Sequence, residues 1–328
     1  MITIALDAMG SDNAPAADVE GAVIAAREFN YRIILVGDKA LIERELDKHR
    51  PVPENISIQH CPEVIGMHEQ PVLSVRRKKQ SSIVVLAKLA KEKKVDAIVG
   101  AGNTGAMVCA ATLKCRLLDG IERAGIGVVM PTLKGAVLMI DAGANIDARP
   151  WHLLQYAIMG SAYSQYILNN PSPKIGLLNV GEEESKGTGS LKEAFGLLEL
   201  SGLNFIGNIE GRDIFTGDCD VIVCDGLVGN VALKVSESTA HALTEMLKKS
   251  LKSGLMSKVG ALLSRKAFHL FKKRMDYTEY GGAPLLGIDG TCIICHGSST
   301  PKAIKNAIRV AGEEVIKNVN QHIVEKIK

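Results

Sequence analysis

The chain has 328 residues, of which 46% are hydrophobic and 23% are charged, and its formal net charge is +3. This length and composition indicate an ordinary globular protein that can bury a large core, as one α/β domain or as two lobes. Aromatic residues make up only 4%, which argues against the exposed rings of a nucleic-acid stacking surface. The small net charge implies no partner by itself.

Strand-like apolar runs alternate with helical patterns through the first part of the chain. Strands are predicted at Ile2–Leu6, Arg32–Val36, Ile56–His60 and Ala97–Val99. Helices are predicted at Ala16–Phe29, Lys39–Lys48, Val72–Lys94 with a break near Gln80–Ser82, and Thr104–Leu117. Residues 61–70 form a loop between them. This alternation is typical of a doubly wound sheet with helices on both faces.

The second part begins with a predicted hairpin and continues the alternation. Gly125–Met130 and Ala136–Ile140 read as strands joined by a short turn, so the sheet is predicted to be mixed, although mostly parallel. Further strands are predicted at Ile175–Leu178, Val221–Cys224, Pro284–Ile288 and Cys292–Cys295. Further helices are predicted at Trp151–Leu168, Leu191–Ser201, Val231–Leu251 and from Pro301 to about Glu325. We therefore expect a three-layer αβα sandwich, with residues 1–328 forming a single α/β domain.

Three further features of the sequence concern its cellular setting. The seven cysteines are odd in number and several lie in apolar runs, which favours reduced thiols in a cytoplasmic protein. Cys292 and Cys295 have the spacing of a metal pair, but three positions apart in a strand they point to opposite faces, so no metal is expected. The chain starts on a strand-like run and has no long apolar segment, which predicts neither a signal peptide nor a membrane span.

Five of the predicted strands end on turns rich in Gly, Asn or Asp. Because the carboxyl ends of parallel strands share one edge of a sheet, we expect these turns to gather in one crevice. Glycine lets backbone N–H groups approach a ligand, and a helix N-terminus favours an anion. The five turns begin after Leu6, Val99, Leu178, Cys224 and Cys295.

The turn at residues 100–106 is the most specific of these signals. Gly102 and Gly105 permit close approach of the backbone, Asn103 is a good N-cap, and Thr104 adds a hydroxyl at the positive end of a helix. These four residues are candidate phosphate ligands. The alternative is a tight capped turn without a ligand. The turn is not a Walker A loop, and it lacks the glycine spacing of a dinucleotide site.

Three other turns supply candidate ligands and catalytic groups, each of which could instead be an ordinary structural turn. In the acidic turn after Leu178, Asn179 and Gly181 are candidate phosphate ligands, and Lys186 could bind phosphate or polarise a carbonyl. After Cys224, Asp225 could position a substrate and Asn230 could donate to an oxyanion. After Cys295, the backbone and hydroxyls of Ser298 and Ser299 fit an anion nest, and His296 could act as an acid or base.

Two further aspartates are candidates for the site, and the sequence lacks the usual motifs of a catalytic nucleophile. Asp7 and Asp141 each end a strand and could support the other groups. The chain has no Gly-x-Ser-x-Gly elbow, and no cysteine pairs with a histidine in a pattern typical of a nucleophile. This favours direct transfer between two bound substrates over a covalent enzyme intermediate.

Taken together, these motifs resemble the bacterial phosphate acyltransferase family of phospholipid synthesis. The matching segments, in the family's order, are Asp7–Gly10 with Asp12 and Pro15, Gly102–Ala106, Leu178–Glu184 with Lys186 and Gly187, Asp225–Gly226 with Gly229–Asn230, and His296–Gly297 with Ser299. One departure is Ser11, where the family usually has a second glycine. The resemblance implies a fold like those of phosphate acetyltransferases and isocitrate-type dehydrogenases, no cofactor, and a homodimer that attaches reversibly to the membrane.

The same resemblance implies that a long-chain acyl group passes from acyl-[acyl-carrier-protein] to inorganic phosphate. Two alternatives remain open at this point: a short-chain acyl-CoA:phosphate transferase, and a non-catalytic scaffold at the membrane. Acyl-chain preference cannot be predicted from the sequence.

Residues 248–274 form a basic amphipathic segment, predicted to be a helical insertion. It holds nine Lys or Arg residues and no acidic residue, and its apolar residues recur at helical spacing. Three uses compete: a helix packed on its own domain, a docking surface for the acidic carrier protein, and an interfacial anchor on anionic lipid. The residues expected to make the contact are Leu255, Lys258, Val259, Leu262, Arg265, Lys266 and Phe271.

Overall fold

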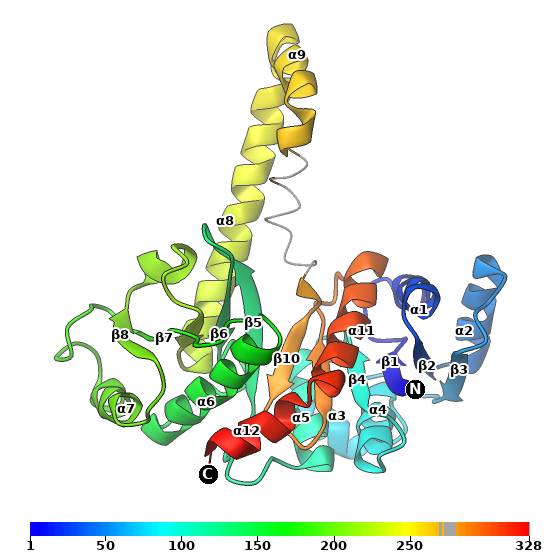
Figure 1. Ribbon diagram of the computed structural model, residues 1–328. Helices are drawn as coiled ribbons and strands as arrows, with labels where there is room; N and C mark the ends of the chain where they lie inside the picture. The colour runs from blue at the N-terminus through cyan, green and yellow to red at the C-terminus, as the bar shows by residue number, and fades with distance from the viewer. Residues whose placement is uncertain (269–270, 272–279, 328) are drawn as a thin grey trace.

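The computed structural model describes residues 1–268, 271 and 280–327 (Figure 1). In this part of the chain, eleven strands form one sheet in the order β3-β2-β1-β4-β11-β10-β5-β6-β9-β7-β8. The strands of its first half are β3 (Ile56–His60), β2 (Tyr31–Gly37), β1 (Ile2–Asp7), β4 (Ala97–Gly100) and β11 (Thr291–Ile294). The remaining strands are β10 (Ala283–Leu286), β5 (Gly125–Pro131), β6 (Ala136–Ile140), β9 (Val221–Val223), β7 (Ile175–Leu178) and β8 (Phe205–Ile209).

The two halves of the sheet run in opposite directions. Strands β3, β2, β1, β4 and β11 are mutually parallel, and so are β6, β9, β7 and β8. Between the halves, β10 pairs antiparallel with β11 and with β5, and β5 pairs antiparallel with β6. Three reversals in a row therefore place the carboxyl ends of β1, β4 and β11 at one edge and those of β6, β9 and β7 at the other. The expectation that all five turns share one edge is wrong for this reason.

Helices cover both faces of the sheet. One face packs against α1 (Ala16–Glu28), α2 (Lys39–Leu46), α6 (Pro150–Tyr166), α7 (Gly189–Glu199), α11 (Pro301–Ile316) and α12 (Val319–Ile327). The other face packs against α3 (Pro71–Arg77), α4 (Ser82–Lys91), α5 (Thr104–Cys115) and the first turns of α8 (Gly226–Lys252). Two short 3-10 helices lie at Asp47–His49 and Gly211–Phe215. The predicted three-layer αβα arrangement around a mixed sheet is confirmed.

Several element boundaries differ from the prediction for local reasons. The helix expected from Pro301 to about Glu325 is broken into α11 and α12, because Asn318 takes a left-handed conformation with φ of 48°. Strand β8 was not predicted, since its sequence Phe-Ile-Gly-Asn-Ile is short and interrupted by glycine. The predicted break near residues 80–82 is present as the gap between α3 and α4.

Helix α8 and the short helix α9 (Leu255–Leu263) form an arm that projects from the sheet (Figure 1). With 27 residues, α8 is about 40 Å long, and only Gly226 and Gly229 in its first turn are buried. The arm contains most of the predicted basic insertion, whose residues 269–270 and 272–274 lie outside the described residues. No helix among the described residues is long and apolar enough to cross a membrane.

Candidate functional site

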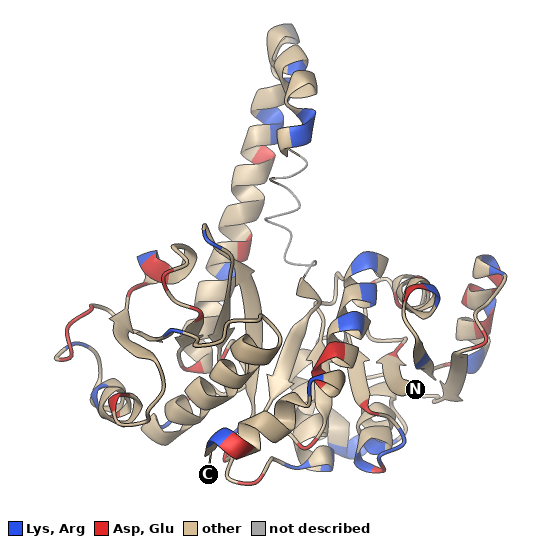
Figure 2. Cartoon of the chain, viewed as in Figure 1, with Lys and Arg blue, Asp and Glu red and all other residues tan. Residues whose placement is uncertain are grey.

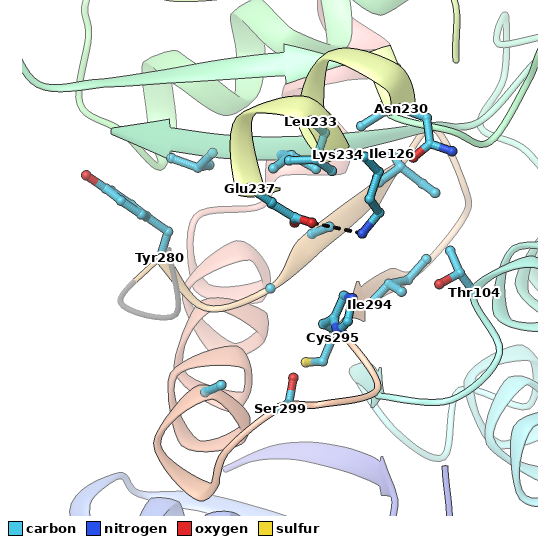
Figure 3. A pocket seen from close by; sticks show the side chains of 17 residues that line it. Thr104, Ile126, Asn230, Leu233, Lys234, Glu237, Tyr280, Ile294, Cys295 and Ser299 are labelled. Carbon is cyan, nitrogen blue, oxygen red and sulfur yellow. Dashed lines mark hydrogen bonds and ion pairs between the residues drawn. The ribbon is translucent and has the colours of Figure 1, made fainter. Parts of the chain in front are cut away.

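A cavity lies over the central strands β5, β10 and β11, between α5 and α8 (Figure 3). Its volume is about 180 Å³. The floor is apolar and comes mainly from β5, β10 and β11, while the polar side chains come from the ends of three helices. The lining residues include Thr104, Ile126, Val128, Asn230, Leu233, Lys234, Glu237, Tyr280, His296 and Ser299.

The N-terminus of α5 forms one wall of the cavity. Thr104 is the first residue of the helix and is exposed, whereas its N-cap Asn103 is only 7% exposed. The side chain of Asn103 accepts a hydrogen bond from the backbone N–H of Ala106 at 3.0 Å. Its amide nitrogen donates to the backbone carbonyls of Gly66, Met67 and Glu69 at 3.1 to 3.2 Å. Asn103 therefore clamps the loop at residues 61–70 onto α5, and only Thr104 of the pair faces the cavity.

The two glycines of this turn allow close packing of the chain. A Cβ atom at Gly105 would lie 2.6 Å from Cγ of Pro71, at the start of α3, and one at Gly102 would lie 3.3 Å from the Cα of Gly10. Gly105 therefore lets α3 approach α5, and Gly102 lets the turn after β1 approach the turn after β4. The predicted approach of the backbone is present, but at these two positions another chain segment occupies the space.

The segment between β11 and α11 forms the opposite wall. The backbone N–H of Ser298 donates to Nδ1 of His296 at 3.2 Å, and the Ser298 hydroxyl lies 2.8 Å from the same nitrogen. A neutral His296 ring that accepts at Nδ1 carries its proton on Nε2. Ser299 is buried beside the cavity, and Thr300 caps α11 by accepting from the N–H of Ala303 at 3.3 Å.

Helix α8 provides the third wall. Asn230 and Lys234 lie one turn apart on the same face, and Nζ of Lys234 forms an ion pair of 2.9 Å with Glu237 (Figure 3). A Cβ atom at Gly226 would lie 2.5 Å from the backbone oxygen of Asn145, so the first turn of α8 packs directly on the turn after β6. This contact carries Asn230 to the same cavity as Thr104, although the two belong to opposite halves of the sheet.

Asp141 holds that turn in place. Its fully buried carboxylate accepts hydrogen bonds from the backbone N–H groups of Ile126, Gly143, Ala144 and Asn145 at 2.7 to 3.1 Å. Burial raises the pKa of Asp141, and these donors oppose that shift. Asp141 therefore positions the turn under α8.

Asp7 lies deeper, behind the turn after β4. Its Oδ1 accepts from the N–H of Met9 at 3.0 Å, while Oδ2 has no hydrogen-bond partner among the described residues. Asp18, whose Oδ2 accepts from the Ser11 hydroxyl at 2.6 Å, is a second buried carboxyl nearby. Burial raises the pKa of Asp7 to about 6 and that of Asp18 to about 7. Neither carboxyl lines the cavity.

The remaining predicted residues lie elsewhere. Lys186, Asn179 and Gly181 belong to the loop after β7, which the structure describes in full and which contributes no residue to the cavity. The amide of Asn179 bonds within its own loop, to the backbone oxygen of Lys186 at 3.3 Å and to the N–H of Val180 at 2.8 Å. Asp225 caps α8 by accepting from the N–H groups of Leu227 and Val228 at 2.9 and 3.0 Å.

The structure thus gathers part of the predicted site and adds residues that the sequence did not single out. Thr104, Asn230, His296 and Ser299 line the same cavity, together with Lys234, Glu237 and Tyr280. The sequence contained a signal for Lys234, because it follows Asn230 by four residues and two such residues in a helix lie on the same face. Tyr280 had no such signal, since it precedes β10 outside any motif.

The electrostatic character of the cavity follows from these walls. The N-termini of α5 and α11, helices of 12 and 16 residues, meet at it, and the dipole of each helix contributes a partial positive charge there. Lys234 adds a positive charge, which its ion-pair partner Glu237 on the same wall partly offsets. An anion is therefore favoured at the polar end, and an apolar group is favoured on the floor of Ile126, Val128 and Leu233.

Comparison with known proteins relates this chain to one family. Residues 2–322 match the family described as "Fatty acid synthesis protein". The phosphate acyltransferase of Geotalea daltonii is 51% identical over 325 residues, which cover 99% of this chain and 94% of that protein. The phosphate acyltransferase of Geobacter sulfurreducens is 50% identical over 325 residues, with the same coverage.

Solved structures share the fold at low sequence identity. A phosphotransacetylase from Streptococcus pyogenes has a TM-score of 0.65 at 16% identity, covering 96% of this chain and 94% of that one. The EutD phosphotransacetylase from Staphylococcus aureus has a TM-score of 0.62 at 15% identity, with the same coverage. These likenesses confirm the predicted phosphate acetyltransferase-like fold. The matches over nearly the full length establish that the chain belongs to the bacterial phosphate acyltransferase family.

Proposed function

We propose that the cavity binds inorganic phosphate beside an acyl thioester and transfers the acyl group to phosphate. The observation that supports this most is the meeting of two helix N-termini and Lys234 above an apolar floor. Such a site holds a small anion and an uncharged acyl group next to each other. Holding both reactants in one geometry supplies much of the acceleration.

The reaction needs one nucleophile, one oxyanion site and one leaving group. An oxygen of phosphate attacks the thioester carbonyl carbon, and the carbonyl oxygen becomes an oxyanion. The amide of Asn230 donates a hydrogen bond to that oxygen. The C–S bond then breaks, acyl phosphate forms, and the thiolate leaves. The proton that hydrogen phosphate loses passes to this thiolate, and the Nε2–H of His296, whose Nδ1 accepts from the N–H of Ser298, donates a hydrogen bond to the departing sulfur.

The donor that we propose is a long-chain acyl group carried by acyl carrier protein, with the product used in phosphatidic acid synthesis. The arm supports this assignment because it is basic and apolar. Val259, Leu262 and Phe271 are 48%, 69% and 54% exposed, so these residues of the stripe are accessible to a partner. Figure 2 shows Lys and Arg near the end of the arm. Lys258 lies in α9, and Arg265 and Lys266 follow it in the sequence.

The arm offers two surfaces for partners. Its basic end, including α9, suits the acidic carrier protein and an anionic membrane surface, both of which attract positive charge. Along α8, the exposed residues Val231, Val235, Leu243 and Met246 form an apolar face beside the site. We propose that a second copy of this chain covers that face in a homodimer, since such a face is uncommon on a monomer.

One assay tests the function. Purified protein is supplied with phosphate and with either long-chain acyl-carrier protein or acetyl-CoA, and acyl phosphate is trapped with hydroxylamine. We expect product from the long-chain carrier thioester and little from acetyl-CoA. Preference for acetyl-CoA would establish the short-chain alternative, and the absence of product from every thioester would favour the non-catalytic scaffold.

A further inference from the structure

A second concave surface adjoins the cavity along the side of α5. It has a volume of about 410 Å³ and shares Thr104 with the cavity, so the two adjoin at the N-terminus of α5. Its walls come from α3, α5, the segment at residues 117–124 and the turn at residues 143–145. We call it the α5 groove.

Several exposed or partly buried apolar side chains line the α5 groove. Val72 is 50% exposed and Leu113 is 58% exposed, while Val108 and Leu117 are partly buried between them. Exposed apolar residues scattered singly need no explanation, but several in a concave surface that leads into a site indicate a binding groove.

The rim of the α5 groove is basic. Arg76 of α3 and Arg123 both line it. The acidic residue on the rim, Glu122, lies 3.1 Å from Nε2 of His152, so its charge is partly engaged elsewhere. An apolar channel with a positive rim complements a hydrocarbon chain carried by an acidic protein.

We infer that the α5 groove binds the acyl chain of the thioester donor, with the thioester at Thr104 and the chain running along α5 toward Leu113. This assignment rests on the proposed function and adds the site that recognises chain length. Val108 and Thr112 lie one and two turns from Thr104, at about 6 Å and about 12 Å along the helix axis. Longer acyl chains therefore contact residues of the groove that lie farther from the thioester.

Two substitutions test whether the α5 groove holds the acyl chain along its length. Val108→Trp would block the α5 groove near the thioester, and Thr112→Trp would block it farther out. Donors with butyryl, octanoyl and palmitoyl chains on the same carrier are compared by kcat/KM. We expect butyryl to be accepted by both variants, octanoyl to be impaired only by Val108→Trp, and palmitoyl to be impaired by both.

The expected size of the effect follows from methylene burial. Each methylene that loses its place in an apolar site lowers affinity about fourfold, so displacing two or more lowers the palmitoyl to butyryl ratio at least about tenfold. A folding defect would lower the rates with all three donors together and would leave this ratio unchanged. The graded pattern is therefore specific to the groove.

A matched control fills the cavity instead of the groove. Leu233→Trp narrows the cavity from the α8 side, and we expect it to slow all three donors alike. A Leu233→Trp variant that discriminates by chain length, together with Thr112→Trp that keeps the wild-type ratio, would overturn the assignment. Wild-type protein that forms no acyl phosphate from any donor would instead overturn the proposed function.

Cys109 gives a second readout that does not depend on turnover. It lines the α5 groove and is half-buried, whereas the other six cysteines are buried. Alkylation by N-ethylmaleimide, followed by mass spectrometry, should modify Cys109 first. A palmitoyl thioether analogue of the donor should slow this modification at least about fivefold, and a butyryl analogue should not. Equal rates with both analogues would contradict a chain lying over Cys109.

Discussion

Lys234 and Glu237 form an ion pair of 2.9 Å on the wall of the cavity, one helical turn beyond Asn230. The pair lies across the cavity from Ser299, which directly precedes the N-terminus of α11 (Figure 3), and His296 lines the same cavity. Lys186, the cation suggested by the sequence, lies in a loop that does not reach this cavity.

The first prediction compares these two lysines. Lys234→Ala removes a positive charge beside the bound anion, and we expect KM for phosphate to rise about 10- to 100-fold, in line with the loss of a charge-assisted hydrogen bond. Lys186→Ala should stay within about threefold of wild type, a change of about 0.65 kcal/mol. Steady-state kinetics with varied phosphate measure both. The opposite ranking would return the catalytic role to Lys186.

The second prediction concerns the contact between Gly229 and the turn after β6. A Cβ atom at Gly229 would overlap the backbone oxygen of Asp141, which cannot move because its own side chain anchors the turn. We expect Gly229→Ala to lower the free energy of unfolding by about 1–3 kcal/mol, the usual cost of overpacking. The same change should abolish activity, because it displaces Asn230. Urea denaturation and the acyl phosphate assay measure the two effects.

The matched control for Gly229 is a glycine in open space on the arm. Gly260 lies inside α9, and a Cβ atom there would meet nothing within 4 Å. Because alanine loses less backbone entropy than glycine in a helix, Gly260→Ala should leave activity unchanged and stabilise α9 by about 0.5–1 kcal/mol. Equal behaviour of the two variants would mean that Gly229 is not a packing constraint.

The third prediction concerns pH and the buried carboxyl of Glu314. Burial, with the nearby charge of Glu313, raises the pKa of Glu314 to about 8, and its Oε1 has no hydrogen-bond partner in the part of the chain that the structure describes. The folded protein holds this proton more tightly than the unfolded chain, whose pKa is about 4.5. The stabilising contribution is therefore complete below about pH 4.5 and falls as pH rises through about 8, by up to about 1.4 kcal/mol per pH unit.

Glu314→Gln tests this dependence because glutamine cannot ionise. We expect the loss of stability between pH 6 and pH 8.5 to be smaller in Glu314→Gln than in wild type, as measured by urea denaturation. Glu199→Gln, which changes an exposed carboxylate, should keep the wild-type dependence. An unchanged slope in Glu314→Gln would show that Glu314 is already ionised in the folded protein.

The fourth prediction concerns the end of the arm. Leu262 is 69% exposed on α9, so Leu262→Glu should leave the folded state intact while it adds a negative charge to an apolar, basic surface. If this surface contacts lipid, the variant should lose sedimentation with anionic vesicles and keep activity on soluble carrier thioesters. Leu200→Glu, at a leucine that is 86% exposed on the body, should still sediment like wild type.

Salt provides an independent check on the same surface. Wild-type sedimentation should weaken between 0.1 M and 1 M salt, because the Debye length shrinks from about 10 Å to about 3 Å. Wild-type protein that ignores anionic vesicles even at low salt would leave the carrier protein as the partner of the arm.

Local sequence determined the elements and several of their ends. Apolar periodicity and turn residues act over a few positions, so the alternation of strands and helices, the β5–β6 hairpin and the N-cap at Asn103 were all predictable. Where an element differs from its prediction, the cause is also local, but its sequence signal is weak. One example is Asn318, whose left-handed conformation divides α11 from α12. These features need no knowledge of which strands are neighbours.

The meeting of the site residues was decided only by the tertiary structure. Three successive antiparallel pairings, β11 with β10, β10 with β5 and β5 with β6, reverse half of the sheet. This reversal separates the loop of Lys186 from the turns after β4 and β11, and the cavity lies between α5 and α8. Asn103 looked like a ligand because its carbonyl partners at residues 66–69 lie far away in sequence. Strand order and long-range hydrogen bonds depend on packing between segments that are distant in the chain, so a local turn motif does not determine them.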